Sequence, residues 1–220
     1  GVRLDAAGVL VRLADGRWQL KPRESEDVEV RVATVSIATA RTMTVGQTVR
    51  IDGVALNGWA TFGDGIVHVS DGTASIRVRR METSFIEAGD SVRFVGTLSL
   101  SSGEPLITSV SATNFSSAAN PPRPEFVTTG EAADAREGEL DAALVKVFGA
   151  RIDAITTVGS DTHVTVDDGT GPVTVILDRD TGISSSGYST GESIDVQGVL
   201  AASGTRWMLK PRSSSDVTRP

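Results

Sequence analysis

The sequence contains no cysteine, and lysine, histidine and aromatic side chains are scarce. Without cysteine the chain can form no disulfide, thiolate metal site or thiol catalytic centre. Its two histidines, His68 and His163, belong to no zinc signature, and neither a phosphate-binding loop nor a nucleophile elbow is present. Because aromatic residues make up only 5% of the chain, hydrophobic cores must come mainly from Val, Ile, Leu and Ala.

An excess of positive charge is missing as well. The formal net charge is −7, whereas a surface that grips phosphate backbones needs Lys or Arg at each contact. Any nucleic-acid binding must therefore be confined to a local patch. No run approaches the roughly 18 apolar residues of a transmembrane helix, so no membrane insertion is expected.

What the sequence does contain is a repeat. GVRLDAAGVL at 1–10 aligns without a gap to GESIDVQGVL at 191–200, and GDSVRFVGTL at 89–98 is a third copy. Apolar residues alternate in each copy, as in a half-buried strand. A polar turn and a second strand follow each one, reading RWQLKP, RWMLKP and PLITSV respectively. The repeated unit is predicted to be a β-hairpin.

A second repeated block precedes two of the three hairpins. It covers 49–80 and 144–178, and each copy reads as three strands with an Asp-Gly turn before the third, at Asp71-Gly72 and Asp168-Gly169. Three strands, a connector and a hairpin match the oligonucleotide/oligosaccharide-binding (OB) fold, a five-stranded Greek-key barrel. The predicted fold is all-β, with tandem five-stranded OB-fold barrels preceded by an orphan C-terminal OB hairpin.

The expected domain organisation follows from the repeats. Four parts are predicted: the orphan hairpin at 1–28, the first complete OB unit at 29–115, a Pro-rich linker at 116–125 and the second complete OB unit at 126–220. The orphan hairpin lacks the three strands that would complete its barrel. We expect neighbouring domains or subunits to supply them, so in isolation the hairpin should dimerise, swap with a copy or remain mobile.

Only short helices are expected, in the connectors near 37–41, 83–88 and 129–136. Ser36 is a predicted N-cap, and Thr128 and Glu131 have the spacing of a capping box. Four glycines are expected where a strand bends or passes close to another, as small barrels require. These are Gly53, Gly96, Gly149 and Gly198.

The segments SIATARTMTVGQTVRIDGVAL, HVSDGTASIRV and AGDSVRFVGTL resemble the OB-fold modules of secreted bacterial nucleases of the YhcR-like group. The likeness covers essentially the whole chain, but its motifs are mostly structural glycines and turns. It implies an extracellular or cell-surface setting and a nucleic-acid role. The catalytic domain of such nucleases is not among these residues.

The best candidate for a nucleic-acid surface lies in the first complete unit. In ASIRVRR, Arg77 and Arg79 should face outward on the third strand, with Arg80 at its end, and OB folds bind oligonucleotides across strands 2 and 3. Trp59 and Phe62, in the loop between strands 1 and 2, could stack on bases, and His68 could project from strand 2 beside them. The alternative is a solvated arginine stripe with Trp59 covering a barrel end. The matching strand of the second unit, PVTVILD, carries no basic residue.

The hairpins offer a second set of candidate residues. Trp18 and Trp207 occupy the slot that Leu106 fills in the other hairpin, which favours a core role for both rings. The repeated LKPR segments place four cations where they could contact a partner or a phosphate: Lys21, Arg23, Lys210 and Arg212. They could also be solvated strand ends that pair with Asp27 and Asp216.

Neither catalysis nor a cofactor or metal is expected, because the histidines do not occupy equivalent slots and one strand with its turn rarely supplies a triad. Two functions remain open. One is a non-catalytic interaction or spacer module of a larger extracellular bacterial protein or assembly. The other is an accessory module of a secreted nuclease that binds single-stranded DNA or RNA.

Overall fold

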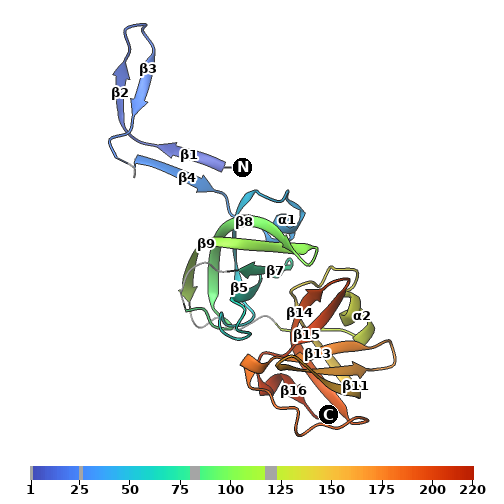
Figure 1. The fold of residues 1–220 in the computed structure, drawn as a ribbon. Coiled ribbons are helices and arrows are strands. Elements are labelled where there is room, and N and C mark those ends of the chain that lie inside the picture. Colours follow the sequence, from blue (N-terminus) through green and yellow to red (C-terminus); the bar gives the residue numbers. More distant parts are fainter. Residues whose placement is uncertain (1, 25–26, 80–84, 117–122) are drawn as a thin grey trace.

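The computed structural model describes residues 2–24, 27–79, 85–116 and 123–220. The chain forms a projecting N-terminal segment followed by two barrels that contact each other (Figure 1). The N-terminal segment contains β1 (Val2–Ala6), β2 (Val9–Arg12), β3 (Trp18–Lys21) and β4 (Val28–Val32). No helix within the described ranges is both long and apolar enough to cross a membrane.

The first barrel closes through five strands in the order β5-β6-β7-β9-β8. Its elements are α1 (Ile37–Thr42), β5 (Thr48–Ala55), β6 (Ile66–Ser70), β7 (Ser75–Arg79), β8 (Ser91–Ser101) and β9 (Glu104–Ser116). The third and fifth strands, β7 and β9, run parallel, and every other pairing is antiparallel. Alternate apolar residues of each strand point inward and fill the core, which contains the fully buried ring of Phe94.

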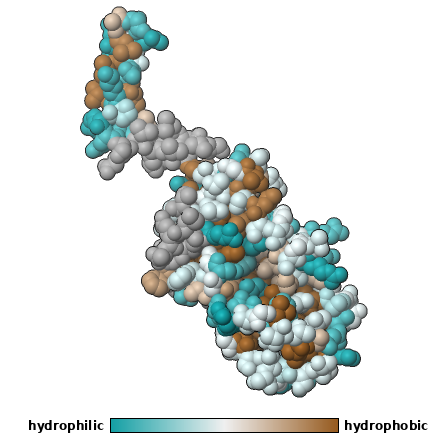
Figure 2. All heavy atoms as spheres, in the orientation of Figure 1, coloured by the Kyte–Doolittle hydropathy of each residue, from teal (hydrophilic) through white to brown (hydrophobic). Residues whose placement is uncertain are grey.

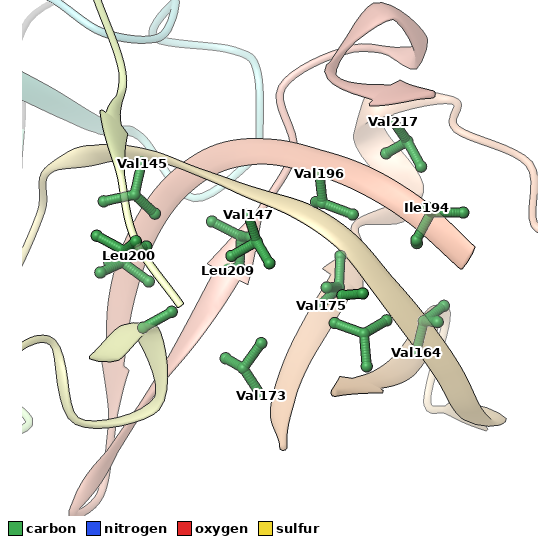
Figure 3. Close-up of a cluster of buried hydrophobic side chains, with 14 of the residues drawn as sticks. Val145, Val147, Val164, Val173, Val175, Ile194, Val196, Leu200, Leu209 and Val217 are labelled. Carbon is green, nitrogen blue, oxygen red and sulfur yellow. The ribbon is translucent and has the colours of Figure 1, made fainter. Parts of the chain in front are cut away.

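The second barrel repeats this arrangement. Its elements are β10 (Glu125–Phe126), α2 (Thr129–Asp134), β11 (Leu144–Val158), β12 (Asp161–Asp167), β13 (Val173–Leu177), η2 (Arg179–Thr181), β14 (Ser193–Ser203), β15 (Arg206–Lys210), η3 (Ser214–Asp216) and β16 (Val217–Thr218). Pairing of β11 with β14 closes the barrel, and β13 and β15 run parallel. Figure 3 shows its core of valine, isoleucine and leucine. The predicted all-β OB fold is confirmed.

The predicted helix starts agree with the structure. Ser36 accepts a hydrogen bond from the Thr39 N–H, and Thr128 and Glu131 form a complete capping box. The helix expected near 83–88 is not found over 85–88, where 85–87 have no regular secondary structure and a turn begins at Ala88; residues 83–84 lie outside the described residues.

Each short helix is tied to its barrel by the Asp-Gly turn before the third strand. Asp71 accepts from the N–H of Ile37, the first residue of α1, at 2.8 Å, and Asp168 accepts from the N–H of Thr129, the first residue of α2, at 3.1 Å. The turn threonines Thr73 and Thr170 accept from the next helical N–H in the same way. The repeat therefore conserves a clamp that satisfies N–H groups at a helix start.

The four predicted glycine positions are special for two different reasons. A Cβ on Gly53, Gly96 or Gly198 would lie within 3 Å of backbone atoms on a neighbouring strand. Gly149 has space around it but adopts φ +57°, where the β11–β14 register shifts. The first three permit close strand approach, and the last permits a bulge.

The N-terminal segment forms two separate ladders. β2 pairs with β3 in the expected hairpin, and β1 pairs with β4, so the segment continues past residue 28 to Val32. The suggested pairing of Arg23 with Asp27 is present, with Nε and Nη2 contacting the two carboxylate oxygens at 3.1 and 3.2 Å. Arg212 and Asp216 pair in the same way at 2.8 and 3.0 Å.

We predict that Asp71→Ala and Asp168→Ala will each destabilise the protein by about 1 kcal/mol, the usual cost of a lost helix cap. Burial alone would raise the pKa of both carboxyls, but hydrogen bonds from Thr73 and Ile37, or from Thr170 and Thr129, outweigh it and hold each pKa below its ordinary value. The clamp should therefore stabilise the fold above about pH 4 and be lost as pH falls below it. Urea unfolding at two pH values measures both effects.

Asp153→Ala is the control, because Asp153 is exposed and its ion pair is with Arg151 on the same strand. It should change the free energy of unfolding by less than about 0.5 kcal/mol. Equal losses for Asp153→Ala and Asp71→Ala would contradict the clamp.

Candidate nucleic-acid interface and the contact between the barrels

The six residues expected to bind nucleic acid are divided by the structure into two groups. Phe62, His68 and Arg77 are buried in the contact between the two barrels. Trp59 is half-buried and Arg79 is exposed, both outside that contact, while Arg80 lies outside the described residues. Strands 2 and 3 of the first barrel, β6 and β7, thus present much of their outer face to the second barrel rather than to solvent.

Arg77 lies at the centre of this contact. Its side chain points out of its own barrel, as expected, but only 5% of it is exposed because the second barrel covers it. Its Nη2 lies 3.5 Å from the Asp141 carboxylate and donates to the Ser101 carbonyl at 3.0 Å. Trp207 Nε1 donates to the other carboxylate oxygen of Asp141 at 2.8 Å. One carboxylate therefore joins an arginine of the first barrel to a tryptophan of the second.

Arg41 at the end of α1 makes a second bridge. Its guanidinium donates to the Ser75 carbonyl within the first barrel and to the Asp141 and Gly138 carbonyls of the second, at 2.7–2.9 Å. Three backbone acceptors in fixed positions suit the planar fork of arginine. This bridge fixes the 138–141 turn against the first barrel.

An apolar cluster and a lysine complete the contact. Leu56 and Phe62 of the first barrel pack with Leu144 and Val199 of the second. Lys210 Nζ lies 4.1 Å from the centre of the Phe62 ring and 2.9 Å from the Asp178 carboxylate. A cation held over an aromatic face and paired with a carboxylate is stabilised on both sides.

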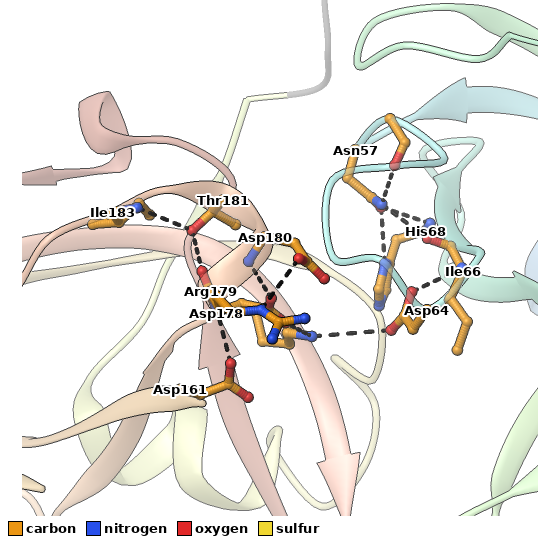
Figure 4. Close-up of polar contacts among 12 residues, drawn as sticks. Asn57, Asp64, Ile66, His68, Asp161, Asp178, Arg179, Asp180, Thr181 and Ile183 are labelled. Carbon is orange, nitrogen blue, oxygen red and sulfur yellow. Dashed lines mark hydrogen bonds and ion pairs between the residues drawn. The ribbon is translucent and has the colours of Figure 1, made fainter. Parts of the chain in front are cut away.

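His68 is buried beside this cluster. Its Nδ1 lies 2.9 Å from the Asn57 side-chain oxygen, which also accepts from the His68 backbone N–H (Figure 4). The Phe62 ring meets the imidazole edge-on. Burial, followed by the positive charges of Arg77 and Lys210, lowers the pKa of His68 to about 3. The imidazole is therefore neutral at physiological pH and serves the packing of the contact.

At three carboxyl groups near the contact the pKa is raised, whereas that of His68 is lowered. Burial raises the pKa of Asp141, Glu104 and Asp64, although nearby cations oppose this rise at each site. Asp64 accepts from the Ile66 N–H and faces the 178–181 segment of the second barrel (Figure 4). Cations and carboxylates at this contact pair with each other across the two barrels, as Arg77 does with Asp141 and Lys210 does with Asp64.

The four cations considered as partner contacts have different surroundings in the two hairpins. Lys210 contacts the first barrel through Phe62, and Arg212 Nη1 donates to the Leu56 carbonyl at 2.8 Å. Their counterparts Lys21 and Arg23 are exposed on the projecting segment. In the second barrel these cations hold a neighbouring barrel of the same chain.

A cavity of about 430 Å³ remains between the barrels. Leu56 and Ser75 line it from the first barrel, and Leu140 and Leu144 line it from the second, with the buried stem of Arg41 between them. No group of His, Asp and Glu suited to a metal ion occurs in the part of the chain that the structure describes.

One open aromatic surface remains on the first barrel. Trp59, in the loop between β5 and β6, meets Phe85 edge-on at 6.5 Å between ring centres, and Phe85 is 78% exposed. The backbone N–H of Trp59 donates to the Ile86 carbonyl at 3.0 Å, and this hydrogen bond holds the loop against the segment after β7. Arg79 ends β7 and pairs with Ile66, the first residue after this loop. We call Trp59, Phe85 and Arg79 the open-end surface.

The second barrel has no equivalent surface on its β12–β13 face. The half-exposed residues of these two strands include no Lys or Arg; they are Asp161, Thr162, His163, Thr165, Asp167, Thr174 and Ile176. This agrees with the difference between the two third strands seen in the sequence.

Sequence reasoning missed Phe85, Arg41 and Asp141. No repeat marked Arg41, because the residue at the same distance from the N-cap of the second helix is Ala133. Phe85 and Asp141 lie in connectors where no periodicity marks them.

No protein-family model and no curated protein matches the chain. Several solved structures are similar to it. A murine DNA-binding protein bound to double-stranded DNA has 15% identity and a TM-score of 0.39, with 73% of this chain and 90% of that chain covered. A replication protein A heterotrimer bound to single-stranded DNA has 21% identity and a TM-score of 0.33, covering 41% and 77%.

The Stn1–Ten1 complex of S. pombe is 24% identical with a TM-score of 0.29, covering 32% of this chain and 54% of that chain. This chain thus spans about half the length of that structure. The two barrels have the OB fold, and proteins similar to the chain include some solved with single- or double-stranded DNA. At these identities and TM-scores, nothing about ligands transfers to this chain.

We predict that Arg77→Ala will destabilise the protein by about 3 kcal/mol, because Asp141 then stays buried without its cation. Urea unfolding gives the loss, and small-angle scattering should show the barrels moving apart. Arg79→Ala, two residues along the same strand but exposed, is the matched control and should change stability by less than about 0.5 kcal/mol. Similar losses for the two variants would contradict the assigned role of Arg77.

We also predict that stability will fall as pH is lowered from about 6.5 towards 3, by up to about 1.4 kcal/mol per pH unit from His68 alone. The unfolded chain binds a proton at His68 that the folded protein excludes. His68→Gln stays neutral and can still donate to Asn57, so it should remove this part of the slope in urea unfolding. His163→Gln, half-exposed on β12, should retain the wild-type slope; the same slope in all three proteins would contradict the assignment.

Proposed function

We propose that the chain is a non-catalytic tandem OB module that binds single-stranded nucleic acid through the open-end surface. The Trp59–Phe85 pair carries this proposal: Phe85 is exposed, and Trp59 is half-buried against the core of the first barrel. Aromatic rings at the loop between the first two strands of an OB barrel can stack on unpaired bases, and Arg79 at the end of the third strand supplies a cation for the backbone. Duplex bases are stacked on each other and offer their faces less readily to such rings.

The charges set the expected strength of this binding. With a net charge of −7 and most arginines already paired with carboxylates or carbonyls, only a few phosphates can be contacted. We expect weak binding that depends strongly on salt. It would suit an accessory module beside a stronger site, as the resemblance to secreted nucleases implies, and we place the protein outside the cell on that resemblance alone.

A second candidate function is favoured by the contact between the barrels. In it the usual binding face of one barrel holds the next barrel, as in a module that spaces or joins parts of a larger assembly. The two functions are compatible, because the open-end surface lies outside the contact.

The test is fluorescence anisotropy with a labelled oligo-dT of about 12 nucleotides, between about 20 and 200 mM salt. Phe85→Ala should weaken binding about ten-fold, because one stacked base is lost. Arg79→Ala should reduce the slope of log affinity against log salt by about 0.7.

Phe126→Ala on the second barrel is the matched control, since Phe126 is 66% exposed and also pairs edge-on with another ring, Phe148. It should bind like the wild type. Absence of binding at the lowest salt, or an equal loss in Phe126→Ala, would overturn the proposal. A duplex of the same length that binds as tightly would contradict the preference for single strands.

A further inference from the structure

The N-terminal segment has the conformation of a completed OB hairpin although no barrel surrounds it. In β2–β3, Leu10 faces Leu20 and Val11 faces Gln19; in β14–β15, Leu200 faces Leu209 and Ala201 faces Met208. These are the same positions of the repeat. The outer ladders also match, because Ala6 faces Val28 as Val196 faces Val217.

Two local contacts that fix this shape are repeated too. A Cβ on Gly8 would lie 2.3 Å from the Lys21 carbonyl oxygen, and one on Gly198 would lie 2.4 Å from that of Lys210. The Arg23–Asp27 pair reproduces the Arg212–Asp216 pair, including a backbone hydrogen bond to the same carboxylate. The segment is therefore folded locally as its counterpart is.

What differs is burial. Leu200 and Leu209 are completely buried in the second barrel, whereas their counterparts Leu10 and Leu20 are 63% and 38% exposed. Trp18 is 64% exposed, while its counterpart Trp207 packs against the core. Figure 2 shows hydrophobic residues along the projecting hairpin, where a soluble hairpin would carry polar ones.

We propose that this face, formed by Leu10, Trp18 and Leu20, docks a three-stranded OB half-barrel that has the same pattern as β11–β13 and has no hairpin of its own. The second barrel supplies the template for the occupant. There β11 pairs antiparallel with β14, and β13 pairs parallel with β15, placing Thr174 opposite Met208 and Val175 opposite Leu209. The partner's first strand would pair along Leu4–Val9, and its third strand would pair parallel with Gln19 and Leu20.

Both complete barrels of the chain already contain their hairpins, so neither has a free site for this segment. A second copy could accept it only by releasing β14–β15 or β8–β9, whose apolar residues would then be exposed instead. The occupant is therefore a half-barrel outside residues 1–220.

The chain itself provides a probe. Residues 123–190 contain the three strands and connector that precede Gly191, and Gly1 aligns with Gly191. Joining a second copy of 123–190 directly ahead of Gly1 of the full chain reproduces the natural connection. In this fusion, amide exchange at 9–12 and 18–21 should slow by about 100-fold relative to the full chain alone. The Trp18 emission should also shift to the blue.

Leu10→Asp in the fusion should abolish the protection, whereas Val45→Asp, at an equally exposed valine of the first barrel, should leave it unchanged. Unprotected amides in the unsubstituted fusion would overturn the proposal. Sedimentation of the full chain alone should show a monomer; a dimer that Leu10→Asp abolishes would assign the face to a second copy and overturn it as well. Neither outcome depends on nucleic-acid binding, because the open-end surface is untouched.

Discussion

The burial of Asp141 between the two barrels constrains the rest of the molecule. A carboxylate from which water is almost excluded needs donors on every side, and here they come from Arg77 of one barrel and Trp207 of the other. Arg41 fixes the backbone of the same turn. Removing a buried charge's partner costs more than the pair contributes, so the two barrels are held in one arrangement rather than merely linked.

This contact also decides which surfaces can act. The β6–β7 face of the first barrel, the usual ligand surface of an OB fold, is largely occupied by the second barrel. The open-end surface, which we propose to bind nucleic acid, lies at the edge of that face. A module of this kind can be both rigid and weakly binding, because the residues best suited to strong contacts are used within the chain.

The N-terminal segment separates local from long-range determinants of structure. Its ladders, glycine contact and ion pair match those of the last hairpin of the second barrel even though it has no barrel around it. Turn chemistry, close strand approach and an arginine–aspartate pair four residues apart are all encoded within about 30 residues. Only burial would need further strands, and the apolar side chains Leu10, Trp18 and Leu20 are not buried.

Much of the fold follows from local patterns in the sequence. Repeated strands, Asp-Gly turns, the caps at Ser36 and Thr128 and the strand-crossing glycines are local or periodic signals, and the structure confirms each of them. Strand alternation in the sequence also predicted correctly that Arg77 lies on the outer face of β7. Whether that face meets solvent or another barrel depends on Asp141, which lies 64 residues further along the chain in a turn without periodicity. Only the tertiary structure could decide this, because alternation along a strand gives the side of the sheet but not what covers it.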